Sequence, residues 1–128
     1  MTTAKRTAYK VEFFFRSKPS IIYPFLAMPS GLQQWFAEEV SVHGKEYTFT
    51  WQGSQERAEL VDRKREKFVK FQWIDREGDE YLLMELIPDE LTGETILAVT
   101  DFENEDEIDD AREMWATAID QLHHIIGG

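Results

Sequence analysis

IDDAREMWATAIDQLHHII, residues 108–126, is the stretch that decides the fold, because its apolar residues recur with the period of an α-helix. One helical stripe would carry Ile108, Ala111, Trp115, Ile119, Leu122 and Ile126. Six acidic residues lie among the eight from Glu103 to Asp110, at the end where the helix dipole favours negative charge. Gly127 and Gly128 follow the last periodic residue and suit a helix stop. The segment predicts a long C-terminal helix with one buried face.

Working back from this helix, the sequence alternates with the period of two that is typical of half-buried strands. In residues 9–16, Tyr9, Val11, Phe13 and Phe15 alternate with a second set that is polar except for Phe14. The same alternation returns in residues 47–51, 69–73 and 82–86, with turn residues between the segments. One apolar face and one polar face predict an antiparallel meander that is covered on one side. Between the first strand and this meander, residues 17–36 predict two short helices separated at Pro29.

The last predicted strand, TILAVTDF at residues 95–102, is apolar on both faces, so two registers stay open. Its inward set is either Ile96, Ala98, Thr100 and Phe102, or Leu97, Val99 and Asp101. The choice decides the place of Asp101, since a shift by one residue turns a side chain to the opposite face. An inward carboxylate would have a raised pKa and would be available as an acid, a base or a ligand anchor.

Composition limits the classes of partner. With 14 Lys and Arg against 25 Asp and Glu, the formal net charge is -11, which disfavours nucleic acid and anionic membrane surfaces as partners. The chain contains no cysteine, which excludes disulfides and thiolate chemistry. The first fifteen residues lack the pattern of a signal peptide, and no apolar run has the length of a membrane span, so we expect a cytoplasmic protein. The 128 residues contain no linker-like segment and predict one domain over residues 1–128.

Four words of the sequence carry a family resemblance: GLQQWF at 31–36, KFVKFQW at 67–73, GETILAVTDF at 93–102 and MWATAIDQLHHII at 114–126. Together with the order of elements, they resemble the START-like, helix-grip superfamily, also called SRPBCC. Within it, the chain looks most like the branch named for the activator of the heat-shock chaperone ATPase. The resemblance implies an α+β helix-grip fold, in which about seven curved antiparallel strands wrap around the long C-terminal helix and leave a cavity between them. It identifies a fold and not a chemistry, because members include lipid carriers, hormone receptors, polyketide cyclases and co-chaperones.

Inward-facing residues are the candidates for lining such a cavity. They are Phe13, Trp35, Phe49, Trp51, Phe71, Trp73, Met84, Asp101, Trp115 and Ile119. The competing interpretation is that the large aromatic residues simply form the core, as they do in most proteins.

Other chemistry has little support in the sequence. The acidic run ENEDEIDD lacks the loop of a calcium site, and the adjacent His123 and His124 would point about 100° apart on a helix. We therefore predict no metal and no cofactor. Nucleophile–base motifs, phosphate-binding loops and metalloprotease motifs are absent from the sequence.

Three functions remain as hypotheses. The leading one is a noncatalytic module that binds a small hydrophobic molecule in the cavity. The second is a protein-interaction or co-chaperone-like module with a second copy or a chaperone as partner, suggested by Phe14, Phe68 and Ile74 on outward faces. The third is a small cyclase or hydrolase, for which an inward Asp101 would be the one hint. No catalytic residue is assigned.

Overall fold

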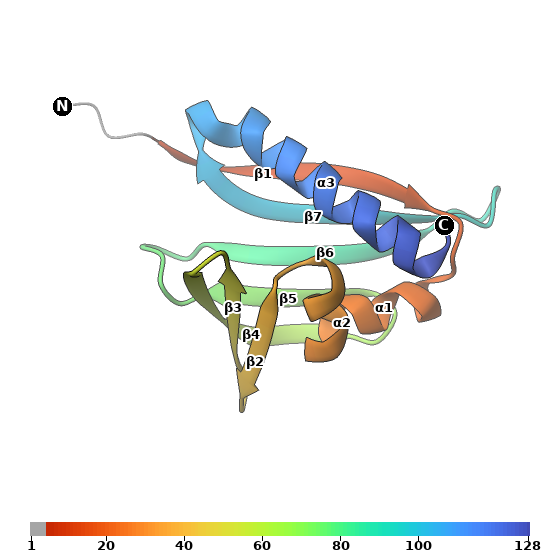
Figure 1. Ribbon diagram of the computed structural model, residues 1–128. Coiled ribbons are helices and arrows are strands. Elements are labelled where there is room, and N and C mark those ends of the chain that lie inside the picture. The colour runs from red at the N-terminus through yellow and green to blue at the C-terminus, as the bar shows by residue number, and fades with distance from the viewer. Residues whose placement is uncertain (1–4) are drawn as a thin grey trace.

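The computed structural model describes residues 5–128 and contains a seven-stranded antiparallel sheet and three α-helices (Figure 1). The elements in chain order are β1 (Arg6–Phe15), α1 (Pro19–Ala27), α2 (Pro29–Trp35), β2 (Glu39–His43), β3 (Glu46–Trp51), β4 (Ser54–Lys64), β5 (Phe68–Trp73), β6 (Tyr81–Pro88), β7 (Thr95–Asn104), the short 3-10 turn η1 (Glu105–Glu107) and α3 (Ile108–Ile126). The predicted helix-grip arrangement is thereby confirmed.

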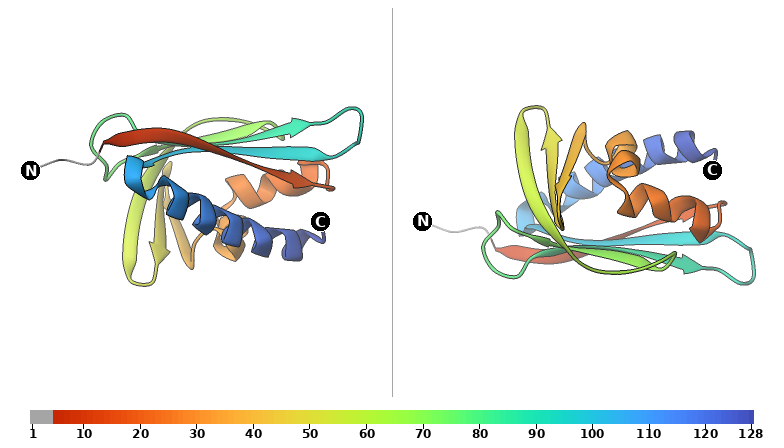
Figure 2. Two further views of the ribbon diagram at one scale, coloured as in Figure 1. Left: turned by 90° about the horizontal axis from the view of Figure 1, so that it is seen from above. Right: turned by 90° about the horizontal axis from the view of Figure 1, so that it is seen from below.

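The order of strands across the sheet is β1-β7-β6-β5-β4-β3-β2, so the first strand pairs with the last one and β2 to β7 form a meander. Figure 2 shows that the sheet is strongly curved and that the helices lie on its concave side. Helix α3 contacts β1 and β7 at one end of the sheet, and α2, which contacts α3, covers β2 at the other end. The core therefore lies between the concave face and the helices.

The alternation read from the sequence matches the burial of the strands. Strand β5 buries Val69, Phe71 and Trp73, and β6 buries Leu82, Met84 and Leu86. On the outer face, polar and apolar residues are mixed and partly exposed. The period-two pattern indicates the inward register correctly because Lys70 and Gln72 in β5, and Glu85 in β6, mark the opposite face.

The open register of the last strand is settled by the pairing of β7 with its neighbours. Asp101 faces Tyr9 of β1, and Val99 faces both Val11 of β1 and Met84 of β6. The inward set is therefore Leu97, Val99 and Asp101, and Asp101 is only 7% exposed. Ala98 is also buried, although it lies on the outer face. This explains why the strand reads as apolar on both sides.

Helix α3 lies across the concave face and also protects the edge of the sheet. Its buried residues are Ala111, Trp115, Ile119 and Leu122. On the open edge of β1, Arg112 donates to the carbonyl of Lys10 and His123 Nε2 to the carbonyl of Phe14, both at 2.8 Å. Such contacts occupy backbone groups that would otherwise be free to pair with another strand. Within the described residues, no helix combines the length and apolarity needed to cross a bilayer.

Helices α1 and α2 pack unusually closely at Gly31. A Cβ at this position would lie against the carbonyl oxygen of Pro24 and 2.7 Å from the Cα of Phe25. The indole of Trp35 donates to the carbonyl of Phe25 at 2.8 Å, which ties the two helices together. This close packing positions Phe36, the residue just after α2, over the concave face of the sheet, where its ring centroid lies 5.0 Å from that of Phe49.

Candidate functional site

Six side chains from five elements and the end of α2 form a closed circuit of contacts inside the molecule. We call them the interior ring: Tyr9, Phe36, Phe49, Trp73, Asp101 and Trp115. On its apolar side, the ring centroid of Phe49 lies 5.0 Å from that of Phe36 and 6.1 Å from that of Trp73. The circuit closes through Trp115, whose ring centroid lies 5.6 Å from that of Phe36.

Asp101 is the charged member of the interior ring. Its Oδ1 accepts hydrogen bonds from Trp73 Nε1 at 2.9 Å and from the Arg76 guanidinium at 3.1 Å. Burial raises the pKa of Asp101 to about 6, against the opposing effects of the Arg76 charge and the bond from Trp73. Desolvation outweighs the ion pair here because the carboxylate is almost completely removed from water. The group can therefore exchange a proton close to neutral pH.

Arg76 connects Asp101 to a wider polar network. Its guanidinium donates to Glu56 at 2.6 Å and to Glu80 at 3.2 Å, and it stacks 4.1 Å from the centroid of Trp73. Burial acts against the charge of Arg76, but the hydrogen bond with Glu56 and the nearby carboxylates outweigh it and raise the pKa of Arg76. Arg6 donates to the same buried Glu80 at 2.7 Å and lowers the pKa of that carboxyl. The network closes one end of the interior.

Tyr9 and Trp115 make the second polar contact of the ring. The Trp115 indole donates to the Tyr9 hydroxyl at 2.9 Å. Burial raises the pKa of Tyr9 to about 12, and the charge of Asp101, its partner on the neighbouring strand, acts in the same direction. Among the described residues, the Tyr9 hydroxyl accepts this hydrogen bond and donates none. Its proton is therefore available to an acceptor atom.

Phe36 spans the space between the sheet and α3. Its ring lies within 6 Å, centroid to centroid, of four aromatic rings: Trp35, Phe49, Trp51 and Trp115. Its carbonyl accepts a hydrogen bond from the Trp51 indole at 2.6 Å. Phe36 itself is only half-buried, so this ring forms part of the boundary between the interior and solvent.

The remaining candidate residues surround the interior ring with different degrees of burial. Phe71, Met84 and Ile119 are fully buried, whereas Phe13 and Trp51 are half-buried. Trp35 is buried, and its indole is bonded to a backbone carbonyl, as is that of Trp51. All ten candidates therefore lie on the concave side or its rim, although their side chains contact one another directly.

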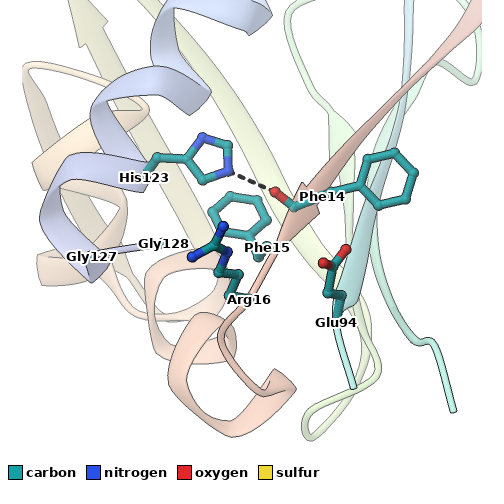
Figure 3. Close-up of a pocket in the computed structure, with 7 residues that line it drawn as sticks. All are labelled: Phe14, Phe15, Arg16, Glu94, His123, Gly127 and Gly128. Atoms are coloured by element: carbon teal, nitrogen blue, oxygen red, sulfur yellow. Dashed lines mark hydrogen bonds between the residues drawn. The ribbon is translucent and has the colours of Figure 1, made fainter. Parts of the chain in front are cut away.

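Two surface pockets lie outside the interior ring. The first, of about 270 Å³, is lined by Phe14, Phe15, Arg16, Glu94, His123, Gly127 and Gly128 (Figure 3). In this pocket the His123 ring stacks on Phe15 with centroids 4.1 Å apart, while Phe14 points away from them. The second pocket, of about 410 Å³, is lined by Gly44, Lys45, Tyr47, Leu60, Val61, Asp62 and Arg63, and we call it the β4 pocket.

The interior ring combines aromatic walls with two polar groups, Asp101 and Tyr9, at one end. Every buried side-chain nitrogen or oxygen in the described part of the chain has a hydrogen-bond partner. Among the same residues, no group of three or more His, Cys, Asp or Glu side chains is placed to hold a metal ion.

Sequence reasoning missed three residues that matter here. Tyr9 lies in the inward register but is not among the ten candidates, Phe36 enters only within the word GLQQWF, and nothing in the sequence marks Arg76. The signal for Tyr9 was present, because it precedes Val11 in the inward register. No local pattern would have found Arg76, whose contacts with Glu56 and Asp101 cross 20 and 25 positions of the chain.

Comparisons with known proteins give one family and several similar structures. The model of the START-like superfamily domain matches residues 3–128. The solution structure of BfR322 from Bacteroides fragilis is 32% identical over 94% of this chain and 91% of that chain, with a TM-score of 0.65. The Aha1 dimer from Colwellia psychrerythraea is 18% identical, covers 91% of this chain and 92% of that chain, and has a TM-score of 0.76. CalU16 from Micromonospora echinospora is 14% identical, with coverages of 98% and 87% and a TM-score of 0.69. The last two show the fold alone, and the comparison with curated proteins returned no match.

Proposed function

Since this chain belongs to the START-like superfamily, we propose that it is a noncatalytic module that binds a small hydrophobic molecule within the interior ring. The observation that carries the proposal is the ring itself, in which Phe36, Phe49 and Trp115 provide apolar walls and Asp101 with Tyr9 provides a polar end. Ligand sites in proteins combine these features, with a few polar groups that fix the ligand's orientation.

Binding requires the ring to open, because its members are in direct contact. Phe36 is the side chain that we expect to move, since it is half-buried and lies just after the short helix α2. Rotation of this one ring would free the space between Phe49 and Trp115. The ligand's affinity would then be reduced by the cost of moving Phe36.

The polar end suggests which ligands fit. The Tyr9 proton is available to a carbonyl or ether oxygen, while Asp101 keeps its bonds to Trp73 and Arg76. An uncharged molecule with an apolar body and one acceptor atom matches both the aromatic walls and the polar end of the interior ring. An anionic ligand would be repelled by the ionised Asp101.

The first experiment is native mass spectrometry of the freshly purified protein, before and after denaturation. A small apolar compound that is retained in the folded protein and released on denaturation supports the proposal. A protein that emerges empty and also fails to bind a neutral apolar dye saturably contradicts it.

A second candidate function is self-association through the outer face of the sheet. Phe14 is 62% exposed and pairs across strands with Ile96, which in turn pairs with Ile87, so the three form an apolar row. Exposed apolar patches often mark interfaces. The Colwellia structure is described as a dimer, which makes a second copy the partner to test. Light scattering that reports a monomer at high concentration, for the wild type and for Phe14→Ser alike, would exclude it.

A further inference from the structure

The β4 pocket owes its chemistry to an irregularity in strand β4. Leu60 pairs with Phe71 and Arg63 pairs with Val69, so three steps along β4 correspond to two along β5. The extra residue forms a bulge between Leu60 and Asp62. Bulges re-aim the side chains that follow them and are frequent beside functional sites.

Because of the bulge, a positively charged side chain takes the place of a negatively charged one on the inner side of the sheet. Val69 and Phe71 are both buried on the concave face, and Lys70 between them is half-exposed. In a regular ladder, Asp62 would stand opposite Val69. The bulge instead pairs Asp62 with Lys70 and puts Arg63 opposite Val69. The Arg63 guanidinium therefore lies on the inner side of β4. Without the bulge, the Asp62 carboxylate would lie there.

Positive charge collects around this pocket in a protein whose formal net charge is -11. Arg63 and Lys45 both line the pocket, with Asp62 as the opposing carboxylate. Among the described residues, ion pairs within 4.0 Å involve Arg6, Arg57 and Arg76, so neither Arg63 nor Lys45 has such a pair. Both cations are exposed and free to meet a ligand.

Helix α1 brings Tyr23 close enough to Arg63 for that charge to act on its hydroxyl. Burial raises the pKa of Tyr23, and the charges of Arg63 and Arg65 oppose that rise. Tyr47 forms the floor, with its hydroxyl already bonded to the carbonyl of Ala27 at 2.9 Å, so that its ring acts as an apolar wall. Leu60 adds a second apolar surface.

We propose that the β4 pocket binds a small molecule through an oxyanion, a carboxylate or a phosphate, held by Arg63 and Lys45 against the apolar wall of Tyr47 and Leu60. A guanidinium and an ammonium that line one pocket suit such a group, because charge-assisted hydrogen bonds are the strong ones. The volume of about 410 Å³ lies within the range of small-molecule sites. The inference does not depend on the interior ring, whose ligand we expect to be uncharged.

The experiment is an amide NMR titration of the full chain with sodium benzoate and, separately, with sodium phosphate. Sodium chloride at matched ionic strength is the reference. We expect saturable shifts, beyond those from chloride, at Gly44, Lys45 and residues 61–63, with either benzoate or phosphate as the stronger ligand. The stronger of the two identifies the oxyanion.

Two variants decide whether the pocket is responsible. Arg63→Gln should weaken binding about tenfold, as expected for the loss of one charge-assisted hydrogen bond. Lys64→Gln removes the same charge one residue further on, but Lys64 pairs with Phe68 outside the pocket and should bind within about twofold of the wild type. Shifts that match those from chloride, or equal weakening by both variants, would overturn the proposal.

Discussion

The Trp73 indole donates to Oδ1 of Asp101 at 2.9 Å, so the aromatic wall of β5 and the buried carboxylate of β7 are joined across the intervening strand β6. This contact lets a carboxylate remain inside the core. Burial of the same carboxylate couples the stability of the fold to pH, because it raises the pKa of Asp101 to about 6, against the lowering effect of the bond from Trp73.

Replacing Asp101 by Asn tests this coupling. The folded protein binds the Asp101 proton more tightly than the unfolded chain, whose carboxyl keeps a pKa near 3.8. The stabilisation from protonation is therefore complete below about pH 4 and is lost as the pH rises through about 6. Relative to Asp101→Asn, the wild type should lose about 3 kcal/mol of unfolding free energy between about pH 3 and about pH 7.5. The measurement is urea unfolding of both proteins across this pH range. A difference in unfolding free energy that does not change with pH would contradict a raised pKa of Asp101.

Removing the guanidinium of Arg76 should destabilise the fold strongly. Arg76→Leu leaves the buried carboxylates of Asp101 and Glu80 without one of their partners, and we expect a loss of about 3 kcal/mol in thermal or urea unfolding. Arg57→Leu is the matched control, because its pair with Asp75 is exposed. The control should change stability far less. Equal losses of stability in the two variants would mean that burial of the Arg76 network does not determine its contribution to stability.

Gly31→Ala tests the close packing of α1 on α2. Alanine favours a helix over glycine by about 1 kcal/mol, but the added Cβ would meet the backbone of Pro24 and Phe25, which cannot easily move away. We expect a net loss of about 2 kcal/mol in unfolding free energy. Ser30→Ala, at an exposed position of the same helix, should be nearly neutral. A stabilised Gly31→Ala protein would show that the two helices have room to separate.

The long helix and the meander could be predicted because their patterns are unambiguous. In residues 108–126, one apolar stripe alternates with an acidic face. In β5, Lys70 and Gln72 mark the outward register, and in β6 Glu85 marks it. Both patterns follow from burying one side of an element against a single core. The overall helix-grip arrangement then follows from the order of the elements together with the family resemblance.

The polar end of the site could not be predicted in the same way. Asp101 faces inward because Trp73 and Arg76, 28 and 25 positions away along the chain, supply donors, and neither partner leaves a local mark. The bulge in β4 is equally hidden, because Val61 continues an ordinary strand sequence. Such features depend on contacts between residues that are far apart in the sequence, and the periodicity of apolar residues carries no information about those contacts.

Phe36 is the point at which the account of the interior ring is most open to test. Phe36→Ala removes the ring that fills the space between Phe49 and Trp115, and so removes the cost of moving it. We expect a loss of about 2 kcal/mol in stability, together with tighter binding of a hydrophobic ligand. Phe14→Ala is the matched control, because it deletes the same group from a side chain that is 62% exposed.

The most direct measurement is a fluorescence titration of the wild type, Phe36→Ala and Phe14→Ala with N-phenyl-1-naphthylamine, a neutral apolar dye. We expect saturable binding of one dye per chain to the wild type, tighter binding to Phe36→Ala and unchanged binding to Phe14→Ala. Absence of saturable binding to the folded wild type, or equal behaviour of the two variants, would contradict a ligand site inside the interior ring.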